Sequence, residues 1–251
     1  MTPSPLLAGE VTVFFLVFAR LGSAVMLLPG WGEGGVPVRV RLLFALVLTV
    51  LLEPVVAARY GAPRDDAAVL GLLFGEILIG TLVGFAVRLL WSGLQIAGGF
   101  VALHTGLAAA SLFDPRQGTQ DTVFGSFLTT TGIAALFAAG GDRYVLALLA
   151  ESWRLLPPGG FDAASALLLL DRLAAVAWRT ALALAAPIVA VALVTQLAMG
   201  LLGRLVPGIQ VLFVALPLQL LVALGVLALT LGVGLAAFLR RFHEALDLFV
   251  S

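Results

Sequence analysis

Two long apolar segments in the C-terminal part of the chain constrain its fold more than any other feature. They run from about residue 173 to 205 and from about 209 to 239. A helix rises 1.5 Å per residue, so each segment would measure roughly 45 Å, whereas a bilayer core is only about 30 Å thick. The pattern predicts a membrane helical hairpin with arms longer than a simple span.

Proline and glycine mark the expected hinges of this hairpin. Pro187 and Pro217 lie near the middle of the two arms, where a proline removes a backbone hydrogen bond and bends a helix. Pro207 and Gly208 stand between the arms and predict a short turn. The excess length has two interpretations: two tilted but ordinary spans, or kinked arms that pack against other protein outside the bilayer.

The composition extends the membrane interpretation to the whole chain. Apolar residues make up 61% of the 251 residues and charged residues 11%, whereas soluble domains carry roughly a quarter charged residues. We therefore predict an all-α integral membrane protein. Further helical segments are expected at about 11–28, 40–58, 67–90, 94–112, 122–139 and 144–155. Residues 238–250 form either an amphipathic tail at the membrane interface or a continuation of the last helix.

Several classes of function find little support. The chain has no cysteine, a net charge of zero and two histidines, His104 and His243. No glycine loop ending in lysine, metal-ligand cluster or pairing of nucleophile and base stands out. We therefore expect no catalytic residue, no cofactor or metal site, and no nucleic-acid partner.

Five charged residues interrupt the apolar segments. Arg20, Glu76, Arg88, Arg179 and Arg204 would each cost a few kcal/mol or more if they faced lipid. For Arg20 and Glu76 we expect pairing that faces protein. Arg88 and Arg204 lie near segment ends, where an arginine can extend its head group to the membrane surface.

A polar loop between two helical segments is the most unusual local feature. It follows the small residues 106–110 and contains proline and glycine. Non-helical backbone at membrane depth requires burial in protein or an aqueous cavity, so the loop could lie in a pore; an ordinary surface loop is the alternative. The residues singled out here are Gly106, Ser111, Leu112, Phe113, Asp114, Pro115 and Gly118.

Four stretches of the chain together form a recognisable pattern. They are residues 28–41 after the first helical segment, 75–80 in the third, 110–118 in the polar loop, and 199–207 with 216–218 in the hairpin. In this order they resemble the FliR/SctT family of type III secretion proteins, and the similarity covers nearly the whole chain. The chain departs from the family pattern at Gln196, Gln210 and Gln219, where asparagine or lysine is common, and at Gly208.

The resemblance implies a subunit of a flagellar export gate in the bacterial inner membrane, within the flagellar basal body. FliP-like helices would occupy about residues 1–165 and a FliQ-like kinked hairpin about 166–251. The implied partners are FliP and FliQ homologues, FlhB and FlhA homologues, membrane lipid and the unfolded proteins that pass through the gate. The loop at about 106–120 would act as the plug, with Phe113 as its bulky element and Asp114-Pro115 fixing its turn.

Alternatives to the flagellar gate stay open. An SctT-like subunit of a virulence-type secretion gate would share the same sequence features. A secondary transporter would need polar groups at mid-membrane and two related halves, which the sequence shows poorly. A purely structural nucleus for FliP and FliQ assembly would not require the loop.

Overall fold

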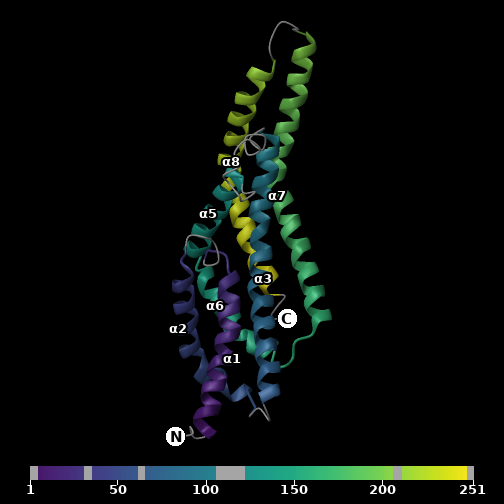
Figure 1. Cartoon of the computed structure of the whole chain (residues 1–251). Coiled ribbons are helices and arrows are strands. Elements are labelled where there is room, and N and C mark those ends of the chain that lie inside the picture. Colours follow the sequence, from purple (N-terminus) through teal and green to yellow (C-terminus); the bar gives the residue numbers. More distant parts are fainter. Residues whose placement is uncertain (1–4, 31–35, 62–65, 106–121, 206–210, 248–251) are drawn as a thin grey trace. The chain divides into compact units, whose positions relative to one another are not determined.

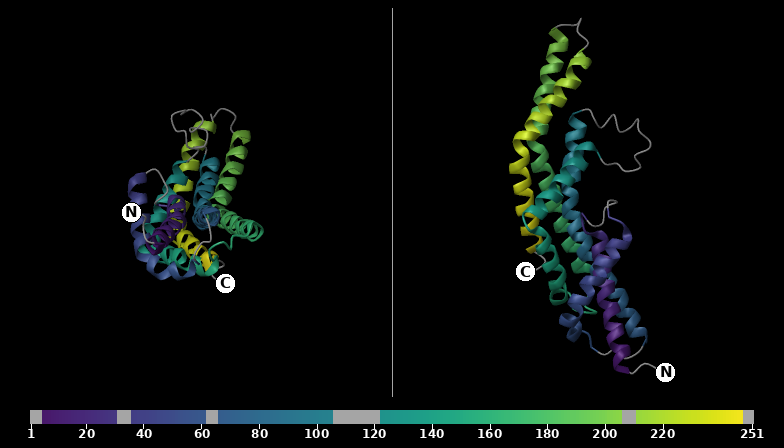
Figure 2. Two further views of the ribbon diagram at one scale, coloured as in Figure 1. Left: turned by 60° about the horizontal axis from the view of Figure 1, so that its bottom comes forward. Right: turned by 90° about the vertical axis from the view of Figure 1, so that its left-hand side faces the viewer.

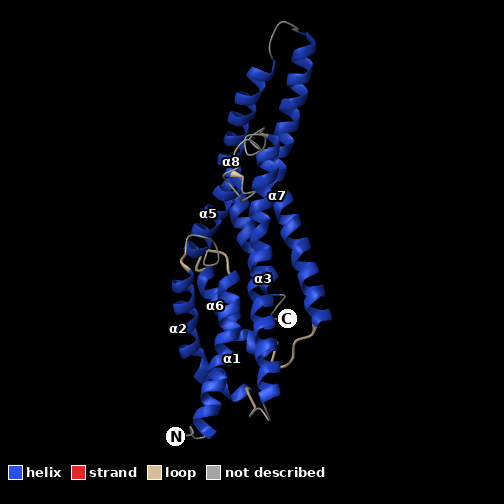
Figure 3. Cartoon of the chain, in the orientation of Figure 1, coloured by secondary structure: helices blue, strands red, loops and turns tan. Residues whose placement is uncertain are grey.

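The computed structural model describes residues 5–30, 36–61, 66–105, 122–205 and 211–247, and every regular element among them is a helix (Figures 1 and 3). The elements are α1 (Pro5–Leu27), α2 (Val38–Val56), the short 3₁₀ helix η1 (Ala57–Arg59), α3 (Asp66–His104), α5 (Val123–Ala138), α6 (Gly141–Leu155), α7 (Ala163–Leu205) and α8 (Val211–Asp247).

Most of these helices are long and apolar enough to cross a membrane. Five qualify on their own, and α5 with α6 qualifies as a pair bent by 80°. The bend occurs at Gly140, whose φ of 71° is a left-handed conformation that glycine adopts without steric cost. Thr122 caps the start of α5 by accepting a hydrogen bond from the Gly125 amide at 3.0 Å. The prediction of an all-α membrane protein is confirmed.

The prediction of separate third and fourth segments is wrong. A single helix, α3, runs through residues 91–93, where a break was expected. Gly93 does not interrupt it, because this glycine lies where α3 approaches α7: a Cβ there would lie 2.9 Å from the Ala177 carbonyl oxygen. The close approach accounts for a glycine within a helix.

Helix α7 begins about ten residues earlier than the apolar pattern predicted. Asp162 caps it by accepting hydrogen bonds from the Ser165 amide at 3.0 Å and the Ala164 amide at 3.2 Å. Hydrogen bonds from the Ser165 side chain and from these two amides hold the pKa of Asp162 below its usual value. The charged Asp171-Arg172 step hid this first part of the helix, since both residues are exposed on its surface.

Helix α8 continues to Asp247, so the C-terminal tail is helical up to that residue. The Tyr144 hydroxyl donates a hydrogen bond to the Asp247 carboxylate. Pro187 and Pro217 lie inside α7 and α8 without interrupting either helix. Their role as hinges stays a prediction, and Pro207 and Gly208 lie outside the described residues.

The chain divides into two compact units that interleave along the sequence. Unit 1 comprises residues 1–90, 140–174 and 245–251, and unit 2 comprises residues 91–139 and 175–244. In unit 2, α7 and α8 run alongside each other in Figure 1 and in the right-hand view of Figure 2. The boundary near residue 165, which separates FliP-like from FliQ-like parts, concerns similarity to other proteins and stays a prediction.

Glycines on α3 set its distance from neighbouring helices inside each unit. In unit 1, a Cβ at Gly80 would lie 2.1 Å from the Arg20 carbonyl oxygen, and one at Gly84 would lie 2.5 Å from the Ala24 carbonyl oxygen. In unit 2, a Cβ at Gly98 would lie 2.3 Å from the Gly125 backbone. These helices therefore pack backbone against backbone, the arrangement that small residues allow in membranes.

Candidate functional site

A buried ion pair joins α1 to α3 inside unit 1. Arg20 is 1% exposed and Glu76 is 0% exposed. The Arg20 guanidinium donates two hydrogen bonds to the Glu76 carboxylate, from Nε to Oε2 and, at 3.0 Å, from Nη2 to Oε1. Such a two-point contact is the strongest geometry available to arginine and a carboxylate. Each charge neutralises the other where neither water nor lipid head groups can do so.

Helix α6 completes the surroundings of Arg20. Its Nη1 atom lies 3.5 Å from the Ser152 hydroxyl oxygen, and that hydroxyl in turn donates to the Leu149 carbonyl oxygen at 2.7 Å. The guanidinium carbon lies 4.6 Å from the centroid of the Trp153 ring, within the range of a cation–π contact. The arginine therefore binds an acidic group, a hydroxyl and an aromatic ring from two other helices.

Tyr60, just after η1, adds a second layer to this cluster. The Trp153 indole donates a hydrogen bond to the Tyr60 hydroxyl oxygen at 2.7 Å, and the hydroxyl also interacts with the Glu76 carboxylate. Burial, followed by the negative charge of Glu76, raises the pKa of Tyr60 well above its usual value. The phenol is consequently neutral at physiological pH and available as a hydrogen-bond donor.

We refer to Arg20, Tyr60, Glu76, Ser152 and Trp153 as the buried polar cluster. The Arg59 Nη1 atom donates a hydrogen bond to the Trp153 carbonyl oxygen at 3.1 Å. Two successive residues after α2, Arg59 and Tyr60, are therefore both hydrogen-bonded to Trp153. The cluster therefore connects α1, α3, α6 and the end of η1. Its chemistry is that of a structural cross-link: each donor faces an acceptor or an aromatic ring, and the two formal charges cancel.

The structure brings together only two of the site residues singled out from the sequence, Arg20 and Glu76. The loop residues Gly106, Ser111, Leu112, Phe113, Asp114, Pro115 and Gly118 lie outside the described residues. Arg88, Arg179 and Arg204 are exposed on their helices. Sequence reasoning missed Tyr60, which follows the expected segment 40–58, and also Ser152 and Trp153, which lie inside the expected segment 144–155. Each carries a single uncharged polar group, which gave no signal in the sequence.

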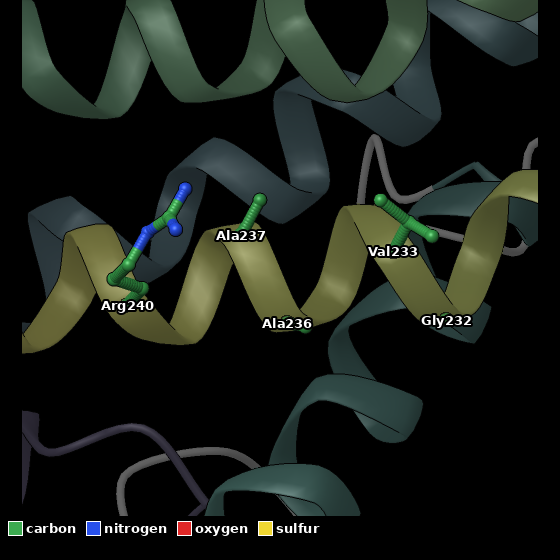
Figure 4. Close-up of a pocket in the computed structure, with 5 residues that line it drawn as sticks. All are labelled: Gly232, Val233, Ala236, Ala237 and Arg240. Atoms are coloured by element: carbon green, nitrogen blue, oxygen red, sulfur yellow. The ribbon is translucent and has the colours of Figure 1, made fainter.

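No metal-binding group of histidine, cysteine, aspartate and glutamate occurs within the part of the chain that the structure describes. A shallow pocket of about 390 Å³ lies on α8. It is lined by Gly232, Ala236 and three residues that project from the same side of the helix, Val233, Ala237 and Arg240 (Figure 4). Arg240 faces Glu244 at 4.0 Å, one turn further along α8. With every lining residue on one helix, this pocket does not resemble an enclosed substrate site.

Comparisons with known proteins agree over almost the entire length of the chain. The family of bacterial export proteins, family 1, matches residues 11–245. The flagellar biosynthetic protein FliR of Caulobacter vibrioides is 33% identical over 244 residues, covering 96% of this chain and 97% of that protein. FliR of Pectobacterium carotovorum is 30% identical, covering 95% and 91%. The secretion system apparatus protein SsaT of Salmonella typhimurium is 25% identical, covering 85% and 83%.

The family match begins within α1 and ends within the last turn of α8, so it includes parts of both compact units. Since the match is continuous over residues 11–245 and is supported by full-length relatives at up to 33% identity, the chain belongs to the bacterial export protein family 1, which includes FliR.

Proposed function

We propose that this chain lines the protein channel of a flagellar export gate together with FliP- and FliQ-type subunits, and that its loop at residues 106–120 closes the channel at rest. The coarser assignment follows from the family: the chain is a subunit of a bacterial flagellar or type III export apparatus and resides in the inner membrane, in the flagellar basal body. The family is a structural one in the export apparatus and not a known enzyme family.

The observation that carries the proposal is the family match together with how little of its apolar surface the chain buries by itself. In each of α2, α7 and α8, only 17% of an apolar stretch of 18 residues is buried inside the chain. Leu197 is 71% exposed and Leu229 is 84% exposed, so the described parts of this chain leave most of these side chains uncovered. Lipid or helices of other subunits must therefore cover these surfaces.

A steric gate also suits the chemistry of the chain. The two formal charges of the buried polar cluster cancel, and no group of histidine, cysteine, aspartate and glutamate among the described residues could hold a metal ion. We assign the energy for transport to other components. The contribution of this chain would be a wall segment and a closing loop. Helices held by glycine contacts and by a buried ion pair would give that wall a fixed geometry.

The test is a secretion assay in cells that lack their own copy of the gene. The native chain should restore export of flagellar proteins. A variant without residues 106–120 should still assemble but let ions or small dyes cross the inner membrane. Unchanged permeability of cells that contain the assembled variant would contradict the plug, and lack of any export defect without the gene would contradict the gate.

A virulence-type secretion gate is the second candidate, favoured by the similarity to SsaT. The relatives at higher identity are named as flagellar biosynthetic proteins. Swimming motility separates the two: loss of the gene abolishes motility only for the flagellar gate.

A further inference from the structure

One face of α7 within unit 2 is exposed from residue 175 to residue 201 and carries an arginine in an otherwise apolar surface. Residues Ala177, Ala181, Ala185, Ile188 and Ala192 are buried on one side of the helix. At 100° per residue, Arg179 points about 160° away from Ala177, so it lies on the opposite side. Between residues 175 and 201, the residues within about 40° of Arg179 on this wheel are all exposed: Ala175, Ala183, Ala186, Ala190, Leu193, Leu197 and Leu201.

The alanines on both sides of Arg179 suit this face to another helix. They recur at spacings of three and four residues around it, and no large side chain stands among them before Leu193. Small residues at this spacing let a second helix approach closely, and interfaces between membrane helices are enriched in them. Beyond the alanines, Leu193, Leu197 and Leu201 are 47%, 71% and 62% exposed and extend the same apolar face.

The charge on this face determines what kind of helix would fit. No carboxylate in the described parts of the chain forms an ion pair with Arg179, in contrast to Arg20, Arg154 and Arg240. A helix packed against the alanines would separate the guanidinium from water and from lipid head groups. An unpaired arginine at that depth is expensive, whereas an arginine that donates two hydrogen bonds to a carboxylate is tolerated.

We propose that the face of α7 centred on Arg179 is the docking surface for a helix of another gate subunit that carries an aspartate or glutamate opposite Arg179. The inference rests on the proposed function in one respect, since the partner is a subunit of the same gate. The occupant is a long apolar helix with small residues and one acidic side chain. The Arg179 guanidinium then fixes the axial position of that helix along α7.

The absence of lysine from the chain allows a direct test. The Arg179→Lys variant keeps the positive charge and, apart from the N-terminus, introduces the only amine. We would co-express it with the neighbouring subunits, purify the complex in mild detergent and treat it with a membrane-permeant carbodiimide, which joins an amine to a carboxylate in contact. Mass spectrometry should find the introduced amine joined to an aspartate or glutamate of a partner subunit. The Arg240→Lys variant is the matched control, because Arg240 already faces Glu244 and should give a link within the chain.

A second measurement uses variants without the charge. Arg179→Gln should lower the recovered partner roughly tenfold or more, the effect of leaving one buried charge unpaired, while Arg240→Gln should leave it unchanged. The docking surface is refuted if the complex forms but the introduced amine is joined to no partner and the Arg179→Gln variant assembles normally. If the native chain recovers no partner at all, the proposed function fails first and the docking surface fails with it.

Discussion

Replacement of Arg20 by methionine tests the most detailed part of the structure. The side chain keeps its approximate length but loses the two hydrogen bonds to Glu76, the contact with Ser152 and the cation–π contact with Trp153. Glu76 then remains fully buried without its counter-ion. Removal of one partner from a buried ion pair typically costs about 3–5 kcal/mol, and we expect a loss of stability of that size.

A double variant separates the pairing from mere loss of packing. Replacement of both residues, in Arg20→Met with Glu76→Met, removes the uncompensated charge, so its stability should return to within about 2 kcal/mol of the native protein. The matched control is Glu151→Gln, which breaks an exposed ion pair with Arg154 on α6. Exposed pairs contribute about 1 kcal/mol or less, so the control should be nearly neutral.

The assay is unfolding in mild detergent by increasing fractions of sodium dodecyl sulfate, followed by tryptophan fluorescence. Trp153, one of four tryptophans in the chain, contacts both Arg20 and Tyr60, so loss of the cluster should change part of the emission. Equal stabilities of the Arg20→Met single variant and the native protein would refute the reasoning. A double variant less stable than either single variant would refute it too.

Three further predictions concern individual residues. Asp162→Ala should increase hydrogen exchange of the first α7 amides, because it removes the cap. Folding lowers the pKa of Asp162, so the carboxylate stabilises the helix start fully above the pKa of the unfolded chain, about 3.8–3.9, and this stabilisation is lost as pH falls through the lower folded value. In Asp162→Asn, which has no carboxylate to titrate, exchange of these amides should not show this pH dependence. Gly80→Ala should cost about 1–3 kcal/mol of stability by forcing α3 away from α1, while Gly71→Ala, with nothing within 4 Å, should not destabilise the same helix. A Tyr144→Phe variant leaves Tyr60 as the only tyrosine. Its absorbance at 295 nm should show no phenolate in the folded protein near pH 10, the pH at which free tyrosine is half ionised. Half-ionisation of Tyr60 at that pH would contradict its burial.

The helices could be predicted from the sequence where apolar length decided the outcome and not where capping or tertiary contacts did. Segments at 122–139 and 144–155 closely match α5 and α6, because glycine and polar residues bound them on both sides. The start of α7 was missed because the charged Asp171-Arg172 step interrupts its apolar pattern, and the cap at Asp162 that begins the helix was not recognised. The break in α3 was expected wrongly because the contact of Gly93 with α7 is not visible in one segment.

The buried polar cluster shows the same limit. A charge inside an apolar segment is visible in the sequence, since its cost in lipid is large, and this drew attention to Arg20 and Glu76. Tyr60 and Trp153 lie 93 residues apart along the chain, and neither residue type is unusual near a membrane helix. Only the packing of α6 against α1 and α3 makes them part of one cluster.

The central claim is that this chain acts as one subunit of a larger gate. The direct measurement is the mass of the particle obtained after co-expression with the neighbouring genes and purification in mild detergent. The account predicts a stable complex in which this chain is joined by several copies of FliP- and FliQ-type subunits. A particle with the mass of the chain alone, stable and folded in the presence of those subunits, would contradict it.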